Sequence, residues 1–296
     1  MPVPLKHNIN MNRLDSKIRA AVISALVEGC SIRSTARMTG ISKPTILKLL
    51  VQACAVASKF QDEVFRNLKC ERIQVDEQWA FCYAKAKNVT PEIAAKNPNA
   101  GDVWLWVAID ADTKLVPCWL LSPGRDAGVA SQFLYDLRQR LDNRVQLTSD
   151  GHRAYLEAVD YAFSGMNVDY AMLVKLYGES AESEKRYSPA QCIGCKRQAI
   201  VGNPDPAHIS TSYVERQNLS MRMGNRRYTR LTNAFSRKIE NHAAAVALYY
   251  FNYNLIKIHG TLRTTPAMAA GVTDRLWEVS DLVALIEATE RLERAA

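Results

Sequence analysis

The chain has 296 residues, of which 48% are hydrophobic and 23% charged, enough for a buried core and typical of a soluble globular protein. Its formal net charge of +8 favours a polyanionic partner such as nucleic acid. No stretch approaches the roughly 18 apolar residues of a membrane span, and the first residues lack a secretory core, so we expect no membrane attachment.

Residues 13–60 are predicted to form helices in a helix-turn-helix arrangement. Ser31 and Ser42 are placed to cap the second and third helices, and Gly40 lies in the turn between them. Glycine suits that turn because it adopts the left-handed backbone conformation easily. The third helix would offer three residues to a DNA groove, namely Lys43, Thr45 and Lys48. The alternative is a plain three-helix bundle.

The middle of the chain predicts a mixed α/β sheet. Strands are expected at 72–81, 102–110, 115–121, 145–148 and 168–176, with helices at 126–141 and 153–163, and loops at 87–101 and 177–209. The predicted order is three strands, then a helix, a strand, a helix and a strand. This is the element order of a ribonuclease-H-like (integrase-type) fold, in which a mixed sheet is flanked by helices. In that arrangement the first and fourth strands lie side by side.

Two carboxylates follow from this topology as a candidate site. Asp76 lies in the first strand and Asp150 at the end of the fourth, so the fold would bring them together. Two carboxylates a few ångströms apart repel each other unless a cation neutralises them. Oxygen ligands suit a hard ion, so we expect Mg²⁺, with Mn²⁺ as the alternative.

A third acid is expected from the long helical region that begins near residue 210. Glu215 is the preferred candidate for the second metal ion of a phosphodiester-cleaving site. Glu184 is the rival by spacing, but it lies in a run of charged residues without an apolar face. Glu77 is expected to point away from Asp76, because neighbouring side chains in a strand alternate between faces.

Basic residues follow the third acid closely. Residues 215–238 hold seven basic side chains and one acid, which is +6 of the net +8. The expected DNA contacts in this region are Arg216, Arg222, Arg226, Arg227 and Arg230. His152, two residues after Asp150, is a further expected DNA contact. The alternatives are a helix cap for His152 and a solvated surface for the basic run.

The three acidic blocks resemble those of DDE transposases. The blocks are Val-Asp-Glu-x-Trp at Asp76, Ser-Asp-Gly-x-x-x-Tyr at Asp150 and Val-Glu-Arg-x-Asn at Glu215. The tail from Tyr253 through His259-Gly-Thr to Gly271 is similar to that of insertion-sequence-one-type bacterial transposases. The resemblance implies Mg²⁺-dependent cleavage and strand transfer at the DNA ends of an insertion sequence. It also implies a basic residue seven positions after the glutamate, where Arg222 stands.

These observations predict a DNA transposase in three parts. A helix-turn-helix domain and link would occupy 1–67, the catalytic domain 68–255 and a helical tail 256–296. Double-stranded DNA is the expected partner, and the family implies at least a dimer in the cytoplasm, associated with the nucleoid. The alternatives are an inactive or domesticated transposase that only binds DNA, and a nuclease of RNA–DNA hybrids.

The seven cysteines leave one question open. An odd number of scattered cysteines favours a reduced, cytoplasmic protein. Cys192 and Cys195 have the spacing of half a zinc site, but no second pair follows, and only His208 is near. Two free thiols are the other interpretation.

Overall fold

The computed structural model describes residues 13–164, 167–178, 192–229 and 232–295. The strands are β1 (Arg72–Cys82), β2 (Gly101–Asp110), β3 (Trp119–Ser122), β4 (Val145–Asp150), β5 (Val168–Tyr177) and β6 (Cys192–Val201). The helices are α1 (Ser16–Val27), α2 (Ile32–Thr39), α3 (Lys43–Val64), α4 (Pro91–Lys96), α5 (Ala127–Arg140), α6 (Ala154–Phe163), α7 (Ser212–Gly224), α8 (Ile239–Phe251), α9 (Pro266–Ala269) and α10 (Val279–Ala295). Short 3-10 turns occur at Ala86–Asn88, Pro206–His208 and Arg226–Tyr228, and a π-helical turn at Asn252–Ile256 continues α8.

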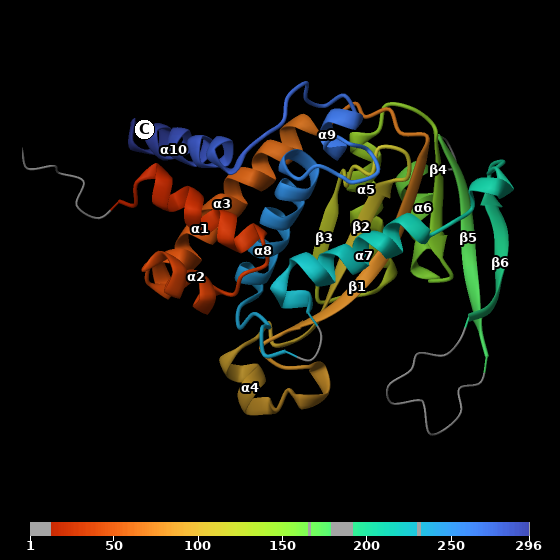
Figure 1. Ribbon diagram of the computed structural model, residues 1–296. Coiled ribbons are helices and arrows are strands. Elements are labelled where there is room, and N and C mark those ends of the chain that lie inside the picture. Colours follow the sequence, from red (N-terminus) through yellow and green to blue (C-terminus); the bar gives the residue numbers. More distant parts are fainter. Residues whose placement is uncertain (1–12, 165–166, 179–191, 230–231, 296) are drawn as a thin grey trace, which may run out of the picture.

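Within the described residues the strands form one mixed sheet in the order β3-β2-β1-β4-β5-β6 (Figure 1). The pairs β1–β2, β2–β3 and β5–β6 are antiparallel, whereas β1–β4 and β4–β5 are parallel. The adjacency of the first and fourth strands, and the mixed sheet flanked by helices, are therefore confirmed. This adjacency matters because it puts residues far apart in the sequence at one place.

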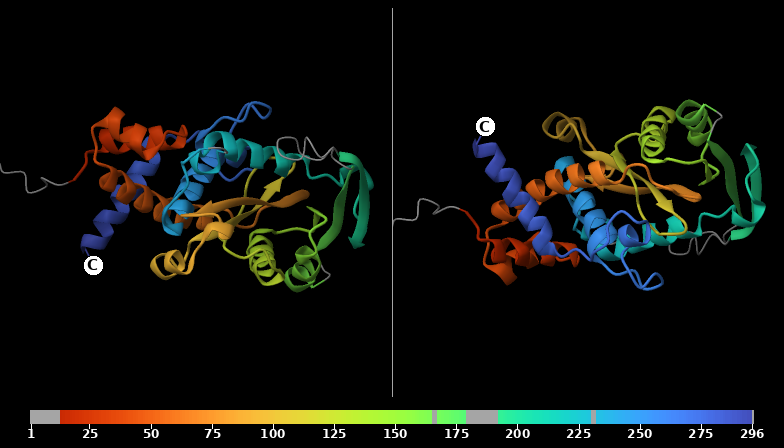
Figure 2. Two further views of the ribbon diagram at one scale, coloured as in Figure 1. Left: turned by 90° about the horizontal axis from the view of Figure 1, so that it is seen from below. Right: turned by 90° about the horizontal axis from the view of Figure 1, so that it is seen from above.

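Helices cover both faces of the sheet (Figure 2). Two of them, α5 and α6, lie on one face, and α7 crosses the other. The apolar pattern of β2 explains why both faces are covered: Trp106 and Ala108 join one core, and Leu105 and Val107 the other. A strand that is apolar on both faces belongs in the middle of a sandwiched sheet, as expected from its sequence.

Two N-terminal helices begin at the residues predicted to cap them, and one of them ends at the glycine predicted for the turn. The Ser31 hydroxyl accepts a hydrogen bond from Ser34 N, and Gly40 closes α2 with a left-handed φ of 72°. Ser42 caps α3 in the same way, but α3 then runs on through residues predicted to be a separate link. The helix packs against α8 and α10, and α1 also packs against α10.

Three predicted segments differ from the structure. The 87–101 loop contains α4, because Thr90 caps a helix that starts at Pro91. The third strand begins at Trp119, since Pro117 cannot donate to a ladder; the Asn254 side chain instead bonds both backbone groups of Val116. The 177–209 loop contains β6, whose residues are mostly exposed and none of them buried, so no alternation marked it as a strand.

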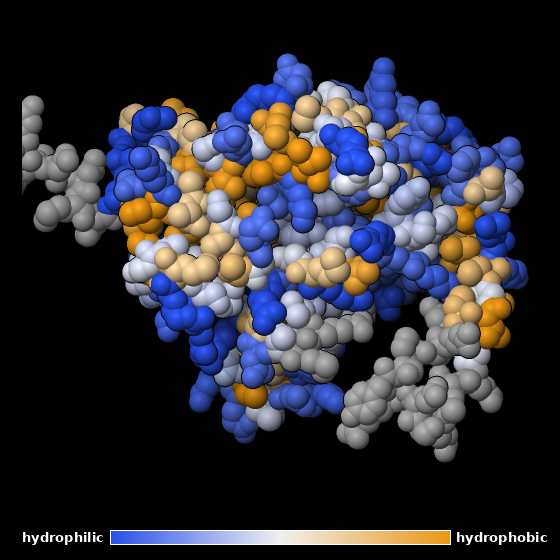
Figure 3. Space-filling view, viewed as in Figure 1, coloured by the Kyte–Doolittle hydropathy of each residue, from blue (hydrophilic) through white to orange (hydrophobic). Residues whose placement is uncertain are grey.

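The surface in Figure 3 is largely hydrophilic, with apolar residues in several separate groups. Among the described residues no single helix is long and apolar enough to cross a membrane. The pair α2 and α3, bent by 111°, meets the criteria of length and composition only when the two are taken together.

Candidate active site

The parallel register of β1 and β4 positions the candidate site. Gln74 lies opposite Thr148, so the same register continued by two residues sets Asp76 beside Asp150. Both carboxylates line a cavity of about 700 Å³ between the sheet and α7. The topology therefore brings together the two acids that the sequence singled out.

Asp76 is held by two hydrogen bonds. Its Oδ1 accepts from Glu77 N at 2.8 Å, and its Oδ2 accepts from Asn218 Nδ2 of α7, also at 2.8 Å. Gln74, two residues earlier on the same face, accepts from Tyr213 N and Val214 N at the start of α7. These contacts fix α7 across β1, with its first turn at Gln74 and its second turn, through Asn218, at Asp76.

The third acid of the cluster is Glu77, not the glutamate expected from the sequence. Asp76, Glu77 and Asp150 each offer one carboxylate oxygen, and the three oxygens lie within 4.8 Å of one another. The prediction that Glu77 points away from Asp76 was therefore wrong. Alternation still holds along β1, but β4 ends at Asp150, so beyond it no strand separates the two faces. The longer glutamate side chain can then reach the aspartates.

Glu215 lines the same cavity from the first turn of α7 but lies outside that cluster. Its Oε1 accepts from Lys175 Nζ of β5 at 2.5 Å and from the Thr211 hydroxyl. Its charge still contributes to the raised pKa of Asp76, which places it within electrostatic range. In this arrangement Lys175 is the cation that neutralises Glu215.

Burial and crowding make the acidic cluster electrostatically unfavourable. Burial, followed by the charge of Asp150, raises the pKa of Asp76 from 3.8 to about 6. The same two causes raise the pKa of Glu77 from 4.5 to about 7, although Arg125 opposes the shift. A carboxylate gains a proton more easily where its charge is desolvated and repelled. A divalent cation would remove both penalties.

Basic side chains line the cavity beside the acids, and two of them lie close to Glu77. Arg125 Nη2 lies 3.4 Å from Glu77 Oε2, and its guanidinium stacks over the Trp104 ring at 4.6 Å. His152 Nδ1 lies 3.4 Å from Glu77 Oε1. Burial and the charge of Arg125 lower the pKa of His152, so its ring is neutral near pH 7. Arg222 of α7 lines the same cavity.

The cluster fits a hard divalent ion. Octahedral Mg²⁺ at about 2.1 Å from each oxygen sets its ligands roughly 3–4 Å apart, which is compatible with three oxygens that all lie within 4.8 Å of one another. Glu77 Oε1 is buried and makes no hydrogen bond among the described residues, so it is available as a ligand. The donors are carboxylate oxygens without a nearby thiolate, which favours Mg²⁺ or Mn²⁺.

The predicted DNA-binding arginines have different positions. Arg216 is exposed on α7, away from the acids, and Arg226 is exposed in a separate 3-10 turn. Arg227 Nε donates to Ser236 Oγ at 2.7 Å, and burial lowers its pKa to about 10. Arg230 lies outside the described residues, as does Glu184.

The predicted continuation of α7 into the basic run was wrong. The helix ends at Gly224, where a Cβ would lie 2.8 Å from Tyr249 Cε2 of α8. Asn225 then fixes the turn, because Nδ2 donates to Ala245 O and Oδ1 accepts from Arg227 N. Helical spacing from Glu215 therefore reaches Arg222 but not the arginines beyond it.

At the N-terminal helices, Lys43 and Lys48 are exposed on the first turns of α3, and Thr45 is half-buried. The Thr45 hydroxyl is 2.8 Å from that of its cap residue Ser42. All three lie in the first two turns of α3, the helix that packs on α8.

Sequence reasoning missed three features of the site, which are Arg125, Lys175 and the place of Glu77 in the acidic cluster. For Lys175 the available signal was a lysine directly after the apolar residues 171–174 of β5. Arg125 follows a Pro-Gly turn and carried no signal at all. Cys192 and Cys195 are exposed thiols on β6, and no cluster of metal ligands including either was found among the described residues.

A scan against protein-family models finds no match. A search of curated proteins finds none either. Among solved structures, the chain is similar to the Mos1 transposase paired-end complex with left transposon end, at 16% identity and a TM-score of 0.23, over 57% of this chain and 61% of that one. It is also similar to the piggyBac transposase synaptic complex with hairpin DNA, at 10% identity and a TM-score of 0.40. That match covers 95% of this chain and 72% of the other. A third similar structure is a pre-cleavage Mos1 transpososome, at 12% identity and a TM-score of 0.27. That match covers 84% of this chain and 80% of the other. These values are too low to assign the chain to a family.

Proposed function

We propose that this protein is a DDE-type DNA transposase that cleaves DNA and transfers strands at the ends of an insertion sequence. The observation that carries the proposal is the convergence of Asp76 and Asp150, from adjacent parallel strands, in one cavity with Glu77 and Glu215. Lys175 pairs with Glu215, but the pKa values of Asp76 and Glu77 stay raised, so a metal ion would relieve the repulsion within the cluster. The sequence blocks around three of these four acids resemble those of DDE transposases, and a ribonuclease-H-like core accounts for the strand order.

In this proposal Asp76, Glu77 and Asp150 hold divalent cations, and Glu215 joins them when DNA is bound. The ions, Mg²⁺ or Mn²⁺, would activate an attacking hydroxyl and stabilise the leaving oxygen of a phosphodiester. The Glu215–Lys175 pair is the resting arrangement. A DNA phosphate near Lys175 would compete for its ammonium group and release the glutamate. Arg125 and Arg222 would position the scissile strand by neutralising its phosphates.

DNA recognition is assigned to two regions. The helix-turn-helix of α2 and α3 would present Lys43, Thr45 and Lys48 to a major groove, and its turn has the left-handed Gly40 that such a unit needs. Arg216 and Arg226 would contact the backbone, since both are exposed. We further propose an oligomer that pairs two DNA ends, acting in the cytoplasm at the nucleoid.

The alternative is an inactive relative that binds DNA without cutting it. One observation favours it: Glu215 is neutralised by Lys175 and lies outside the acidic cluster. Metal binding separates the two, because a protein that only binds DNA has no need to bind divalent ions at Asp76 and Asp150.

The test combines cleavage with metal binding. DNA carrying the ends that flank the gene is incubated with Mg²⁺ or Mn²⁺, and Mn²⁺ binding is measured separately by calorimetry. Asp76→Asn and Asp150→Asn should abolish both cleavage and Mn²⁺ binding while DNA binding survives. Asp160→Asn, an exposed acid on α6, is the matched control and should retain all three. Wild-type cleavage by Asp76→Asn would refute the assignment.

A further inference from the structure

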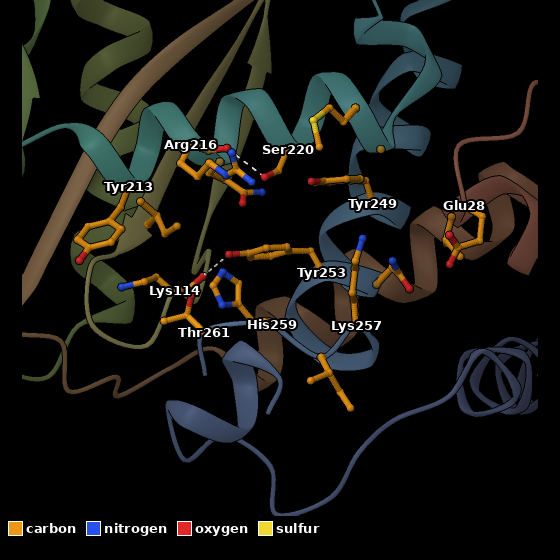
Figure 4. A pocket seen from close by; sticks show the side chains of 18 residues that line it. Glu28, Lys114, Tyr213, Arg216, Ser220, Tyr249, Tyr253, Lys257, His259 and Thr261 are labelled. Atoms are coloured by element: carbon orange, nitrogen blue, oxygen red, sulfur yellow. Dashed lines mark hydrogen bonds between the residues drawn. The ribbon is translucent and has the colours of Figure 1, made fainter. Parts of the chain in front are cut away.

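A second cavity, of about 630 Å³, lies on the opposite side of α7 from the acidic cluster. Helical spacing separates the two. Glu215, Asn218 and Arg222 face the acids, whereas Arg216 and Ser220 face the second cavity (Figure 4). Its other walls are the end of α8 and residues 257–261, which belong to the tail that the proposed catalysis leaves without a role.

Aromatic side chains form one wall of this cavity. Tyr249 and Tyr253 of α8 and its π-helical turn are nearly parallel, with 10° between their ring planes and 6.3 Å between centroids. The Tyr253 hydroxyl donates to Lys114 O at 2.9 Å, which fixes the ring (Figure 4). Tyr213, at the start of α7, lines another part of the cavity, with Lys114 Nζ 3.6 Å from its ring centroid. Fixed aromatic surfaces of this kind suit a planar apolar group.

Positive charge surrounds the same wall. Among the described residues that line the cavity, the basic ones are Lys114, Arg216 and Lys257 beside the neutral His259, and the one acid is Glu28. Burial, and the charges of Lys114 and Arg216, lower the pKa of His259, so its ring is neutral near pH 7. Its Nδ1 is buried and has no hydrogen-bond partner among the described residues. The cavity thus offers cations and an unused polar atom beside aromatic rings.

We propose that this cavity binds one nucleotide of a DNA strand, with its phosphate on Lys114, Arg216 and Lys257 and its base along the tyrosine wall. The volume falls in the range of small-molecule sites, about 300–1,000 Å³, and nucleic-acid strands are held by just this pairing of cations with aromatic rings. An acidic peptide would satisfy the charges but leave the aromatic wall unused. The inference rests on the proposed function only for the identity of the strand as DNA.

The position of the cavity gives the binding a consequence. Only α7 separates it from the acids, and a helix with its side chains is about 10 Å across. A strand anchored at Tyr253 can therefore extend over α7 to the carboxylates. The same helix carries Arg216 toward one cavity and Glu215 toward the other. The tail loop would thus fix the DNA strand relative to the cleavage site.

The test measures binding without catalysis, in the full chain carrying Asp76→Asn, with EDTA present. The probe is a fluorescein-labelled single strand of eight deoxyadenosines, followed by anisotropy, against an abasic strand of equal length. Lys257→Glu should weaken binding of the deoxyadenosine strand at least about tenfold. Thr261→Trp, which fills the cavity without changing charge, should do likewise. Lys96→Glu, the same charge change on exposed α4, is the matched control and should have less than a twofold effect.

The chain that carries Asp76→Asn alone, with its second cavity unchanged, should bind the deoxyadenosine strand about tenfold more tightly than the abasic strand, as base stacking requires. Equal affinity for the two strands would overturn the proposal, and so would an unaffected Thr261→Trp variant or a control as weak as Lys257→Glu. Competition by free deoxyadenosine monophosphate at the concentration of strand nucleotides would overturn the assignment to a strand in favour of a free nucleotide. Because cleavage is absent throughout, failure here is distinct from failure of the transposase assignment.

Discussion

Asp76→Asn should stabilise the metal-free protein while removing its metal site. In the folded chain burial and Asp150 raise the pKa of Asp76 from 3.8 to about 6. A shift of about two units corresponds to about 3 kcal/mol of lost stability when the group is ionised. Asparagine keeps the shape without the charge, so the variant should recover much of that free energy of unfolding.

The sign of the pH dependence follows from the direction of the shift. Because the folded pKa exceeds the unfolded value, the folded state holds the proton more tightly between the two. The free-energy cost of ionising Asp76 is absent below about pH 4 and complete above its pKa in the folded chain. The wild type therefore loses stability as pH rises between these two values. The advantage of Asp76→Asn should therefore be large at pH 8 and vanish toward pH 4.

Hydrogen bonding should not cancel the gain. An asparagine at position 76 can still accept from Glu77 N through its oxygen. Its amide nitrogen can donate to Asn218 Oδ1, which is buried and unpaired, once the Asn218 amide turns over. The local cost of the substitution is then small compared with the charge that it removes.

The assay is thermal unfolding in EDTA at pH 8 and pH 4.5, repeated at pH 8 with Mg²⁺. A gain of about 3 kcal/mol corresponds to about 5 °C in Tm for a chain of this length. Added Mg²⁺ should raise the Tm of the wild type and leave Asp76→Asn unchanged. Asp160→Asn controls for the loss of an acid at the surface. A lower Tm for Asp76→Asn at pH 8 in EDTA would refute the electrostatic reasoning.

Three further changes have outcomes that follow from single contacts. Lys175→Met removes the cation paired with Glu215 and should raise Mn²⁺ affinity several-fold in calorimetry, because the freed carboxylate can join the site. Asn254→Ala leaves the buried N–H and C=O groups of Val116 without hydrogen-bond partners. It should lower the free energy of unfolding, measured in urea, by about 2–4 kcal/mol. Gly40→Ala forces a side chain into a left-handed φ of 72° and should cost about 1 kcal/mol in the same assay.

Matched substitutions make these values interpretable. Asn99→Ala removes an exposed amide, and Gly260→Ala adds a methyl group where no heavy atom lies within 4 Å and φ is not positive. Each should change the free energy of unfolding by less than about 0.5 kcal/mol. Equal effects at Gly40 and Gly260 would contradict the left-handed turn, and unchanged Mn²⁺ affinity in Lys175→Met would contradict the resting pair.

Local chemistry explains why much of the fold was predictable. Caps at Ser31 and Ser42 and the glycine at position 40 act within four residues, so they can be recognised in the sequence. The parallel pairing that brings Asp76 to Asp150 follows from the order of the elements. In contrast, β6 lacks alternation because both its faces are exposed, and no local pattern distinguishes such a strand from a loop.

The amino-acid sequence by itself determined the helical caps, the adjacency of the first and fourth strands and two of the acids at the candidate site. Only the tertiary structure decided which third carboxylate joins them, because that depends on where β4 ends beside Glu77 and on the cation that β5 brings to Glu215. It also decided that α7 ends at Gly224, where the Tyr249 ring leaves no room for a side chain. Caps and alternation act between near neighbours, whereas charge pairing and close contact act across space between residues that the sequence keeps apart.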